Sequence, residues 1–333
     1  MIICVSANPA IDRRLRVKNI EIGAVNRAAA VRSFAGGKAA HVAMAAHALG
    51  EEVVWVGFLG GASGDEVERQ LTELNIHVVA IRTVAQTRTN DEIIDENGNI
   101  TEILEPGGAV TGGELAEMFK VCQMQMAADA GFHMVLSGSL PPGVPDDFYS
   151  RMIVMAREYG GNVILDTSGE ALLAGVKAGP DLIKPNREET EKAVGINVGD
   201  AESAFEAARR LRELGARNVA ISMGADGIFW TDGKDSYLAE PPKVEVFSTV
   251  GCGDAAVAGF AVAAQRNLGK DESIRLAVAC GAANCTAKLP GQVRSADAAR
   301  LSPQIKVKHL SSVAVPSVTT DDVESETVEG VSK

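Results

Sequence analysis

The chain has 333 residues, of which 46% are hydrophobic and 23% are charged, and 44 acidic against 32 basic residues give a net charge of −12. This composition predicts one large α/β domain, or about two domains, with a core that needs no disulfide or metal. The acidic balance argues against nucleic acid and an anionic membrane as partners, and no apolar run reaches the roughly 18 residues of a membrane span. The start of the chain turns polar early and lacks a basic segment, so we expect no signal peptide and a cytoplasmic protein.

Short apolar runs alternate with helical stretches along the chain. The predicted buried strands are 2–7, 53–60, 134–140, 162–168, 181–186 and 218–224, and the predicted amphipathic helices include 113–131, 146–160 and 200–216. This alternation predicts an α/β fold with a doubly wound, mostly parallel sheet flanked by helices. In such folds a ligand binds beyond the carboxyl ends of the strands.

Two segments interrupt the alternation. Residues 12–34 are basic and alternating, and residues 88–104 predict a β-hairpin with its turn at Asn97-Gly98. We interpret them as a small separate β-sheet that covers a cleft as a lid, although an edge hairpin of the main sheet fits the composition equally well. Residues 1–310 would then form one domain, and the Ser-, Thr- and acid-rich segment 311–333 is predicted to be a disordered tail.

The cysteines and histidines give no metal or redox motif. The five cysteines form no CxxC pair, and the five histidines show no recognised ligand spacing. The sequence therefore predicts neither a zinc site nor a dithiol centre.

The segment Gly251-Cys252-Gly253-Asp254 stands between a β-like run and a helix of small residues. Glycine permits close approach of the backbone to a ligand, and the free N–H groups of a helix start favour a phosphate. Asp254 is either a stabilising acid in the first helical turn or a general base beside that phosphate. The chain lacks a GxxxxGK[ST] motif, which argues against a Walker-type nucleotide site.

Other candidate residues follow predicted strands or precede helices. Lys38 follows Gly37 at a helix start, where a cation opposes the helix dipole unless an anion binds there. Asp12 follows the first strand and is either a ligand-contacting acid or a surface turn residue. Asn186 and Glu189 have the spacing of a Mg²⁺ site and equally that of a helix-capping pair.

The order of these features resembles the ribokinase/PfkB family of sugar kinases over residues 1–310. Several stretches are similar to the branch that contains 1-phosphofructokinase and tagatose-6-phosphate kinase: SANPAIDR (6–13), VNRA (25–28), AGGK (35–38), TRTN (87–90), ILEPG (103–107), SGSLPPGVP (137–145), KPNREE (184–189) and STVGCGD (248–254). The resemblance implies a ribokinase-like fold with a β-sheet lid and ATP-dependent phosphoryl transfer.

The resemblance also implies roles for matching positions. Asp254 would be the base, and the N–H groups of Gly251, Cys252 and Gly253 would form the anion hole. Asn186 and Glu189 would organise Mg²⁺, mainly through water. The implied substrate contacts are Asp12, Gly37 and His41 for the sugar, Lys38, Arg88 and Asn90 for its phosphate with help from Arg27, and Ser137 in the sugar-phosphate pocket. The implied ATP contacts are Ser222, Gly224, Gly227, Gly251, Gly253 and Asn284.

Three positions depart from the family pattern GGKGxNVA and GAGD. Ala39 carries a Cβ where the family has glycine, which would restrict a positive φ. His41 replaces an asparagine that touches the sugar, and imidazole is larger and can carry charge. Cys252 replaces alanine, and a thiol at a helix start predicts a lowered pKa and sensitivity to oxidation.

We therefore expect a kinase that uses ATP and Mg²⁺ to phosphorylate a ketohexose phosphate, with fructose 1-phosphate and tagatose 6-phosphate as the leading acceptors. One alternative is a kinase of an unphosphorylated sugar or nucleoside, which Lys38 and Arg88 argue against. Another is a non-catalytic sugar-phosphate-binding regulator, which the presence of Asp254, Asn186 and Glu189 argues against. A homodimer formed through the lid is also expected, because its strands would otherwise leave exposed edges.

Overall fold

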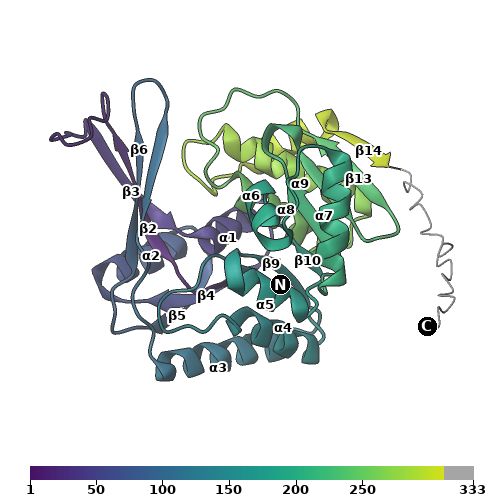
Figure 1. The fold of residues 1–333 in the computed structure, drawn as a ribbon. Helices are drawn as coiled ribbons and strands as arrows, with labels where there is room; N and C mark the ends of the chain where they lie inside the picture. Colours follow the sequence, from purple (N-terminus) through teal and green to yellow (C-terminus); the bar gives the residue numbers. More distant parts are fainter. Residues whose placement is uncertain (311–333) are drawn as a thin grey trace, which may run out of the picture.

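The computed structural model describes residues 1–310, which form a large sheet between two layers of helices and a second, smaller sheet beside it (Figure 1). The segment 311–333 lies outside the described residues, so its predicted disorder stays a prediction. No helix within residues 1–310 is long and apolar enough to cross a membrane.

The large sheet has ten strands in the order β14-β13-β12-β11-β10-β9-β8-β1-β4-β5. Its strands are β1 (Ile2–Ser6), β4 (Val53–Leu59), β5 (His77–Arg82), β8 (His133–Ser137), β9 (Asn162–Asp166), β10 (Leu182–Ile183), β11 (Asn218–Ser222), β12 (Ile228–Thr231), β13 (Ser236–Glu240) and β14 (Lys306–Leu310). In this spatial order, neighbouring strands pair in parallel from β5 across the sheet to β11. The neighbours from β11 to β14 pair antiparallel. The predicted α/β class with a mostly parallel sheet is confirmed.

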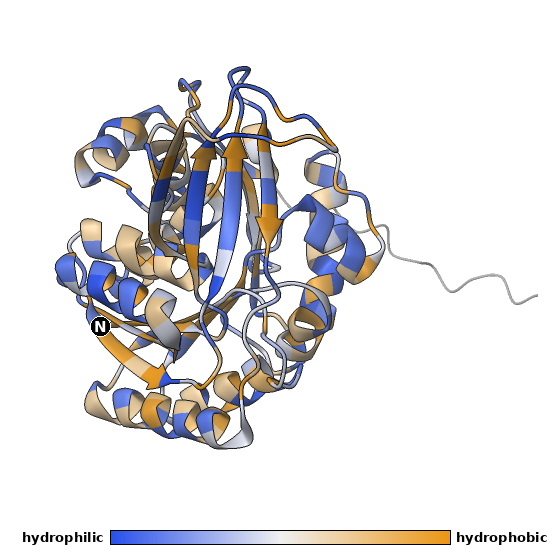
Figure 2. Ribbon diagram, turned by 90° about the vertical axis from the view of Figure 1, so that its left-hand side faces the viewer, coloured by the Kyte–Doolittle hydropathy of each residue, from blue (hydrophilic) through white to orange (hydrophobic). Residues whose placement is uncertain are grey.

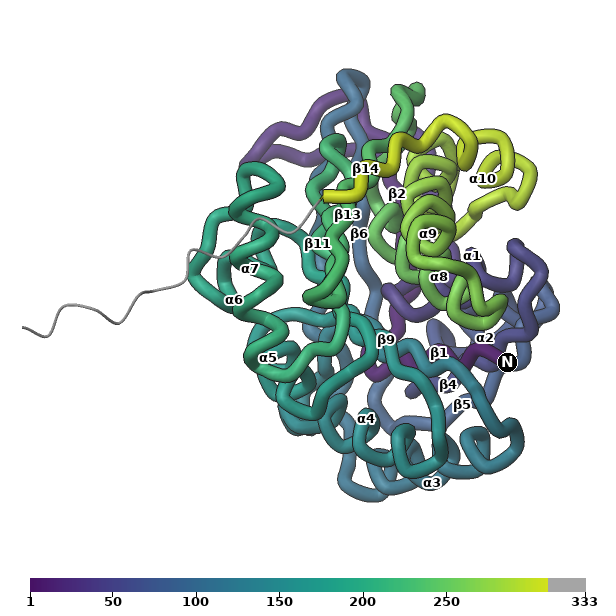
Figure 3. The backbone as a smooth tube through the Cα atoms, turned by 90° about the vertical axis from the view of Figure 1, so that its right-hand side faces the viewer, coloured from purple at the N-terminus to yellow at the C-terminus, as the bar shows by residue number. Residues whose placement is uncertain are grey.

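Both faces of the large sheet are covered, and for this reason its central strands are apolar throughout. In β1, Ile2 and Cys4 pack on one side of the sheet, and Ile3 and Val5 pack on the other. The first side carries α1 (Lys38–Ala48), α2 (Gly61–Glu73), α8 (Cys252–Gln265), α9 (Lys270–Cys285) and α10 (Ser295–Leu301). The second carries α3 (Gly112–Ala128), α4 (Phe148–Glu158), α5 (Gly169–Lys177), α6 (Arg187–Val194) and α7 (Ala201–Glu213). Helices α8 and α9 run side by side (Figure 3).

The two interrupting segments form the small sheet in the order β3-β2-β6-β7. Its strands are β2 (Ala10–Arg16), β3 (Ala30–Gly36), β6 (Arg88–Ile94) and β7 (Ile100–Leu104). They stand side by side in Figure 2, where hydrophilic and hydrophobic segments both occur along them. Gly98, at φ 81°, lies in the predicted turn between β6 and β7. Because β6 pairs with β2 and not with the main sheet, the edge-hairpin alternative is wrong.

Two predicted strands near the site differ from the structure. The run 181–186 forms only the two-residue β10, because Pro185 has no N–H to continue the ladder. The β-like run before Gly251 is no strand: residues 241–250 lie outside helices and strands, and they begin with Pro241-Pro242. The N–H groups of Phe247 and Ser248 instead donate to the carbonyl of Cys285, at 2.8 and 3.3 Å. This irregular segment brings Gly251 to the end of α9.

A buried ion pair joins the small sheet to the rest of the molecule. The guanidinium of Arg14 on β2 makes two hydrogen bonds to Glu92 on β6, at 2.5 and 2.9 Å, and it also donates to the carbonyl of Lys288. Both side chains are buried. On the same two strands, the pair between Arg13 and Asp91 is partly exposed.

Replacement of Glu92 with Gln should lower the free energy of unfolding by about 3 kcal/mol, because it leaves a buried guanidinium charge without its counter-charge. The Asp91→Asn variant is the matched control and should lose less than about 1 kcal/mol, because its pair is screened by solvent. Chemical denaturation of both variants and the wild type tests this. An equal decrease in the free energy of unfolding in the two variants would show that the buried pair stabilises the protein no more than the exposed pair does.

Candidate active site

A cavity of about 1480 Å³ lies where the central strands end, between the small sheet, α1 and the start of α8. Asp12 and Arg88 line it from the small sheet, Lys38 and His41 from α1, and Asp254 from α8. Ligand pockets usually measure about 300–1000 Å³. The cavity therefore has room for two ligands side by side.

The start of α8 presents backbone donors to this cavity. Its N-cap residue Gly251 has φ 78°, a left-handed conformation that favours glycine, and a Cβ there would lie 2.8 Å from Pro290. The N–H of Cys252 donates to the carbonyl of Thr249 at 3.2 Å, so the backbone of Cys252 is not free to bind an anion. Within residues 1–310, the N–H groups of Gly251 and Gly253 have no protein acceptor. These two groups and the positive end of the helix dipole make a site for an anion.

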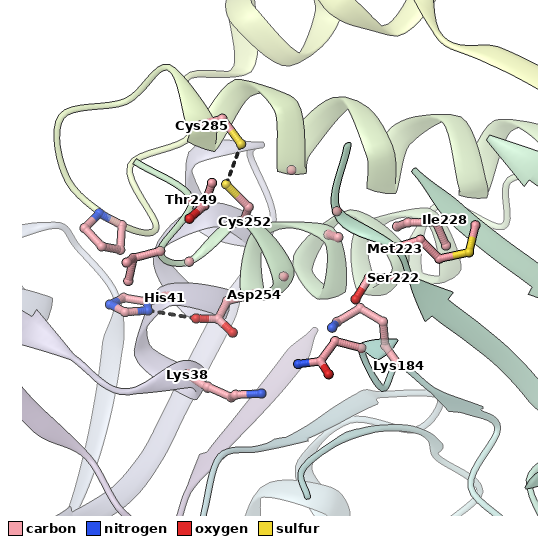
Figure 4. A pocket seen from close by; sticks show the side chains of 18 of the residues that line it. Lys38, His41, Lys184, Ser222, Met223, Ile228, Thr249, Cys252, Asp254 and Cys285 are labelled. Atoms are coloured by element: carbon pink, nitrogen blue, oxygen red, sulfur yellow. Dashed lines mark hydrogen bonds and ion pairs between the residues drawn. The ribbon is translucent and has the colours of Figure 1, made fainter. Parts of the chain in front are cut away.

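His41 bridges the carboxylates of Asp254 and Asp12. Its Nδ1 lies 2.8 Å from Oδ2 of Asp254 (Figure 4). Its Nε2 lies 3.3 Å from Oδ2 of Asp12. Burial alone would lower the pKa of this imidazole, but the two carboxylates raise it to about 10. His41 is therefore an imidazolium at neutral pH, and its charge lies between the two carboxyl groups.

Asp12 has further partners within the small sheet. Burial would raise its pKa, but the charge of His41 and the hydrogen bond from Asn90 lower it below the usual value. Nδ2 of Asn90 donates to Oδ1 of Asp12 at 2.8 Å, whereas Oδ1 of Asn90 is buried without a partner. Gly36 lies against Asp12 so closely that a Cβ would be 2.1 Å from its Cγ.

A second charged cluster surrounds Asp166, which is fully buried at the end of β9. Nζ of Lys184 lies 3.3 Å from Oδ1 of Asp166, and Nζ of Lys38 lies 3.2 Å from Oδ2. Burial would raise the pKa of Asp166, but the two lysine charges lower it. The pKa of Lys38 is raised: burial opposes the charge, and the carboxylates of Asp166, Glu189 and Asp254 outweigh that effect.

Sequence reasoning missed Asp166 and Lys184 as site residues. Asp166 looks like one more residue of a buried strand, and Lys184 lies in a stretch singled out for Asn186. Their positions could have identified them, because both residues lie at the ends of neighbouring parallel strands. Side chains at such ends meet at the same edge of the sheet.

Arg88 lies at the start of β6 and lines the cavity. Its guanidinium donates to the carbonyls of Glu105 and Asn8, at 2.8 and 3.0 Å, and its Nε is buried without a partner. Burial lowers its pKa, although the nearby acids Asp12 and Glu105 oppose this effect. A partly buried guanidinium with an unused donor is suited to a phosphate or carboxylate ligand.

Asn186 and Glu189 form the capping pair at the start of α6. Oδ1 of Asn186 accepts from the N–H of Glu189, and Oε2 of Glu189 accepts from the N–H of Asn186, both at 2.8 Å. The other oxygen of Glu189 lies 3.6 Å from Nζ of Lys38. Within residues 1–310, no group of three or more His, Cys, Asp or Glu residues could hold a metal.

The nucleotide candidates divide into two groups. Ser222, Gly224 and Gly227 line the cavity around the turn that joins β11 to β12. Asn284 does not line the cavity: it lies behind the loop, where its Nδ2 donates to the carbonyl of Val250 at 2.9 Å and its Oδ1 accepts from Gly291.

Two substrate candidates also lie outside the cavity lining. Arg27 is exposed in the connection between β2 and β3. Ser137 is buried behind the cavity, where its hydroxyl donates to Asp166 at 3.3 Å. Gly37 does line the cavity, and its φ of 86° is the conformation for which glycine is needed before α1.

The structure answers the questions raised by Ala39 and Cys252, two of the positions that depart from the family pattern. Ala39 lies inside α1 with a negative φ, so its Cβ strains nothing. The expectation of a lowered pKa for Cys252 is wrong. Its thiol is in hydrogen-bond contact with that of Cys285, and this contact and burial both raise the pKa of Cys252; the same contact lowers the pKa of Cys285.

The family model of pfkB carbohydrate kinases matches residues 1–295. The chain belongs to this family. It is 33% identical to a 1-phosphofructokinase of Vibrio cholerae over 84% of this chain and 88% of that protein. A 1-phosphofructokinase of Rhodobacter capsulatus is 37% identical over 83% of this chain and 87% of the relative. Among solved structures, phosphofructokinase-2 from Escherichia coli in complex with potassium superposes with a TM-score of 0.84 at 28% identity, over 91% of this chain and 98% of that one.

The His41 bridge of this pfkB kinase should make its stability depend on pH. The folded pKa of about 10 exceeds the roughly 6.5 of an unfolded histidine, so the bridge contributes its full stability below about pH 6.5. That contribution is lost progressively as the pH rises toward 10. Denaturant titrations of the wild type and of His41→Asn at pH 6 and pH 9.5 should show a stability difference that shrinks at the higher pH.

The control is His133→Asn, because burial lowers the pKa of His133 and its removal should leave the alkaline loss unchanged. A difference between the wild type and His41→Asn that is the same at both pH values would contradict the imidazolium bridge.

Proposed function

We propose that this protein transfers the γ-phosphoryl group of ATP to a hydroxyl of a ketohexose phosphate, with fructose 1-phosphate as the leading acceptor and tagatose 6-phosphate as the next. The proposal rests mainly on one observation: the carboxylate of Asp254 and the unpaired N–H groups at the start of α8 lie in the same cavity as Arg88, Lys38 and Lys184. The relatives named 1-phosphofructokinase support this acceptor class. The predicted cytoplasmic location stays a prediction.

Within this proposal, the start of α8 stabilises charge on the group in transit. The N–H groups of Gly251 and Gly253 donate to the phosphoryl oxygens, where negative charge is concentrated in the transition state. Lys184 is the nearest cation, with its Nζ 3.3 Å from where a Cβ of Gly253 would lie. These groups are fixed before substrate binds, so little reorganisation accompanies transfer.

Asp254 is the general base of the proposed reaction. Oδ2 is occupied by His41, which leaves Oδ1 to accept the proton of the attacking hydroxyl. The charged imidazole fixes this carboxylate in position. Phosphoryl transfer with a loose transition state depends more on such positioning than on a strong base.

The acidic side chain of Glu189 suits a Mg²⁺ ion held through water. Asn186 uses its side-chain oxygen to cap α6, whereas Glu189 keeps one oxygen that is not used in the cap. Mg²⁺ commonly keeps several waters and binds through one or two carboxylates together with substrate phosphates. When bound, the ion would neutralise phosphate charge, and Glu189 with its neighbour Lys38 would orient the phosphate chain.

The small sheet supplies the residues for the acceptor. Asp12 is held by His41 and Asn90 with its carboxylate ionised, which suits it to accept hydrogen bonds from sugar hydroxyls. Arg88 offers its unpaired Nε to the phosphate already present on the sugar. His41 lies between Asp12 and Asp254, so it would set the distance between the sugar hydroxyl contacts and the base.

The small sheet also supports a proposed assembly. Ile22, Val25, Val31, Ile103 and Leu104 are exposed large apolar residues of this sheet and its connections. Phosphofructokinase-2 from Escherichia coli is described in a tetrameric inhibited form. We infer a homodimer of this chain in which a second copy covers these side chains. Sedimentation should give a dimer for the wild type and a weaker one for Ile22→Asp; a monomeric wild type would contradict the inference.

Asp254→Asn should lower kcat by about 10²–10⁴-fold with little change in the KM for ATP, because a general base contributes about that factor. The assay is coupled ADP release with fructose 1-phosphate, fructose 6-phosphate, tagatose 6-phosphate, fructose, ribose and adenosine. Asp147→Asn is the control, since Asp147 is an exposed acid that makes no side-chain cap to α4. Turnover on a neutral acceptor alone would overturn the sugar-phosphate proposal, and binding without any turnover would favour the regulator.

Arg88→Gln should raise the KM for the phosphorylated acceptor about tenfold or more, because a charge-assisted hydrogen bond to phosphate contributes about 1.5–3 kcal/mol. The KM for ATP should stay near that of the wild type, which also shows that the variant is folded. Arg13→Gln is the matched control, because Arg13 comes from the same sheet, pairs with Asp91 and does not itself line the cavity. An equal rise in the KM for both substrates would remove Arg88 from the acceptor site.

A further inference from the structure

Two cysteines meet beside the anion site, although they are 33 positions apart in the sequence. Cys252 is the first residue of α8 and Cys285 is the last residue of α9. Their sulfur atoms are 2.6 Å apart, and both residues line the cavity (Figure 4). No CxxC spacing reveals the pair in the sequence, because it is created by the packing of the two helices.

We propose that Cys252 and Cys285 are a thiol modification site at which a peroxide forms a reversible disulfide, and that this disulfide arrests phosphoryl transfer. The second half of the proposal rests on the proposed function, whereas the first half concerns the two thiols alone.

The other three cysteines show why the pair is distinct. Cys4, Cys122 and Cys280 are each fully buried in the hydrophobic clusters. Burial raises their pKa values, to about 12 in the case of Cys122 and Cys280, so these thiols stay protonated and shielded. Cys252 and Cys285 are only partly buried and face the cavity. An oxidant that enters the cavity therefore reaches these two thiols.

The pair also favours one sulfur as the first nucleophile. The two sulfurs are in hydrogen-bond contact, and this contact lowers the pKa of Cys285. The first thiolate therefore forms on Cys285. Cys252 then stands in contact as the resolving thiol, the arrangement found in redox-sensitive cysteine pairs.

The chemistry balances with a hydroperoxide as the oxidant. The thiolate of Cys285 attacks one oxygen of hydrogen peroxide, the O–O bond breaks, and the departing hydroxide takes a proton to become water. The sulfur of Cys252 then loses its proton and attacks the sulfenic sulfur of Cys285. The S–S bond forms as the S–O bond breaks, and the departing hydroxide leaves as the second water. Two thiols lose two electrons in total, and a small thiol reductant reverses the change.

The position of the disulfide explains the expected loss of activity. Cys252 lies between Gly251 and Gly253, whose N–H groups form the anion site. The preceding loop is already tied to α9, through Phe247 and Ser248 to the carbonyl of Cys285 and through Asn284 to Val250. A covalent bond at Cys252 changes the backbone geometry between Gly251 and Gly253, so it displaces donors whose fixed placement the transfer step requires. It also removes the thiol contact from Cys252 to the carbonyl of Ser248.

The test treats the fully reduced, full-length protein with a small excess of hydrogen peroxide and reads out the thiols without any substrate. The free thiol count should fall from five to three, and mass spectrometry of a digest should show the Cys252–Cys285 peptide pair. Cys252→Ala and Cys285→Ala should give no such pair. Cys280→Ala is the matched control on α9 and should crosslink as the wild type does.

Activity is then compared with that of each reduced protein. The crosslinked wild type and Cys280→Ala should retain less than a tenth of their ADP release and recover it with dithiothreitol, whereas Cys252→Ala and Cys285→Ala should keep theirs under the same peroxide dose. Mg·ATP present during oxidation should slow the crosslinking, because both thiols line the cavity.

Failure of this proposal is distinguishable from failure of the proposed function. Oxidation of other thiols without the Cys252–Cys285 peptide would overturn the modification site. Complete crosslinking with unchanged kcat and KM would overturn the arrest of transfer. If the reduced protein released no ADP with any acceptor, the proposed function would fail. The modification site would still be tested by the crosslinked peptide. Its effect on the anion site would be tested by ADP binding, which should weaken tenfold or more in the crosslinked protein.

Discussion

The buried imidazole of His41, held between Asp12 and Asp254, is the contact on which the geometry of the site depends. Asp12 comes from the small sheet, His41 from α1 and Asp254 from α8, so one side chain links three parts of the molecule. A charged imidazole in the interior is stable only with both acids beside it, and two acids this close are stable only with a cation between them. The small sheet and the start of α8 are thus tied by mutual charge neutralisation.

The buried pair of Arg14 and Glu92 links the same parts at a second point. Glu92 also accepts a weak hydrogen bond from Ser248 at 3.4 Å, and Ser248 belongs to the irregular loop that leads to Gly251. Arg14 reaches the carbonyl of Lys288, beyond α9. A movement of the small sheet over the cavity would therefore act on the loop that shapes the anion site, through Glu92 and Ser248 as well as through His41. With the proposed acceptor site on the small sheet, these contacts would couple acceptor binding to the placement of the N–H groups at the start of α8.

The fold and most of the site could be predicted because they depend on local patterns. Apolar runs alternating with helices predict the parallel sheet, and the glycines of the GCGD segment and of Gly37 predict the helix starts. The paired charges could not be predicted. Asp166 is hidden by its apolar strand, Ser137 and Asn284 turned out to support the site from behind, and Cys252 meets Cys285 only through the packing of α8 on α9. Long-range contacts of this kind leave no periodic signal in one sequence.

The charge of the whole chain limits how this site can recognise its ligands. With a net charge of −12, the protein repels anions at a distance, yet both proposed substrates carry phosphates. The attraction must come from within the cavity, where Lys38, Arg88 and Lys184 are set among fixed carboxylates and screened little by salt. Asp166 and Glu189 keep Lys38 charged, and Asp166 also holds Lys184 in place, before any ligand arrives. Selectivity therefore depends on short-range geometry. Only an anion that fits the unused donors of Arg88 or α8 gains enough hydrogen-bond energy to exceed the electrostatic repulsion of an acidic protein.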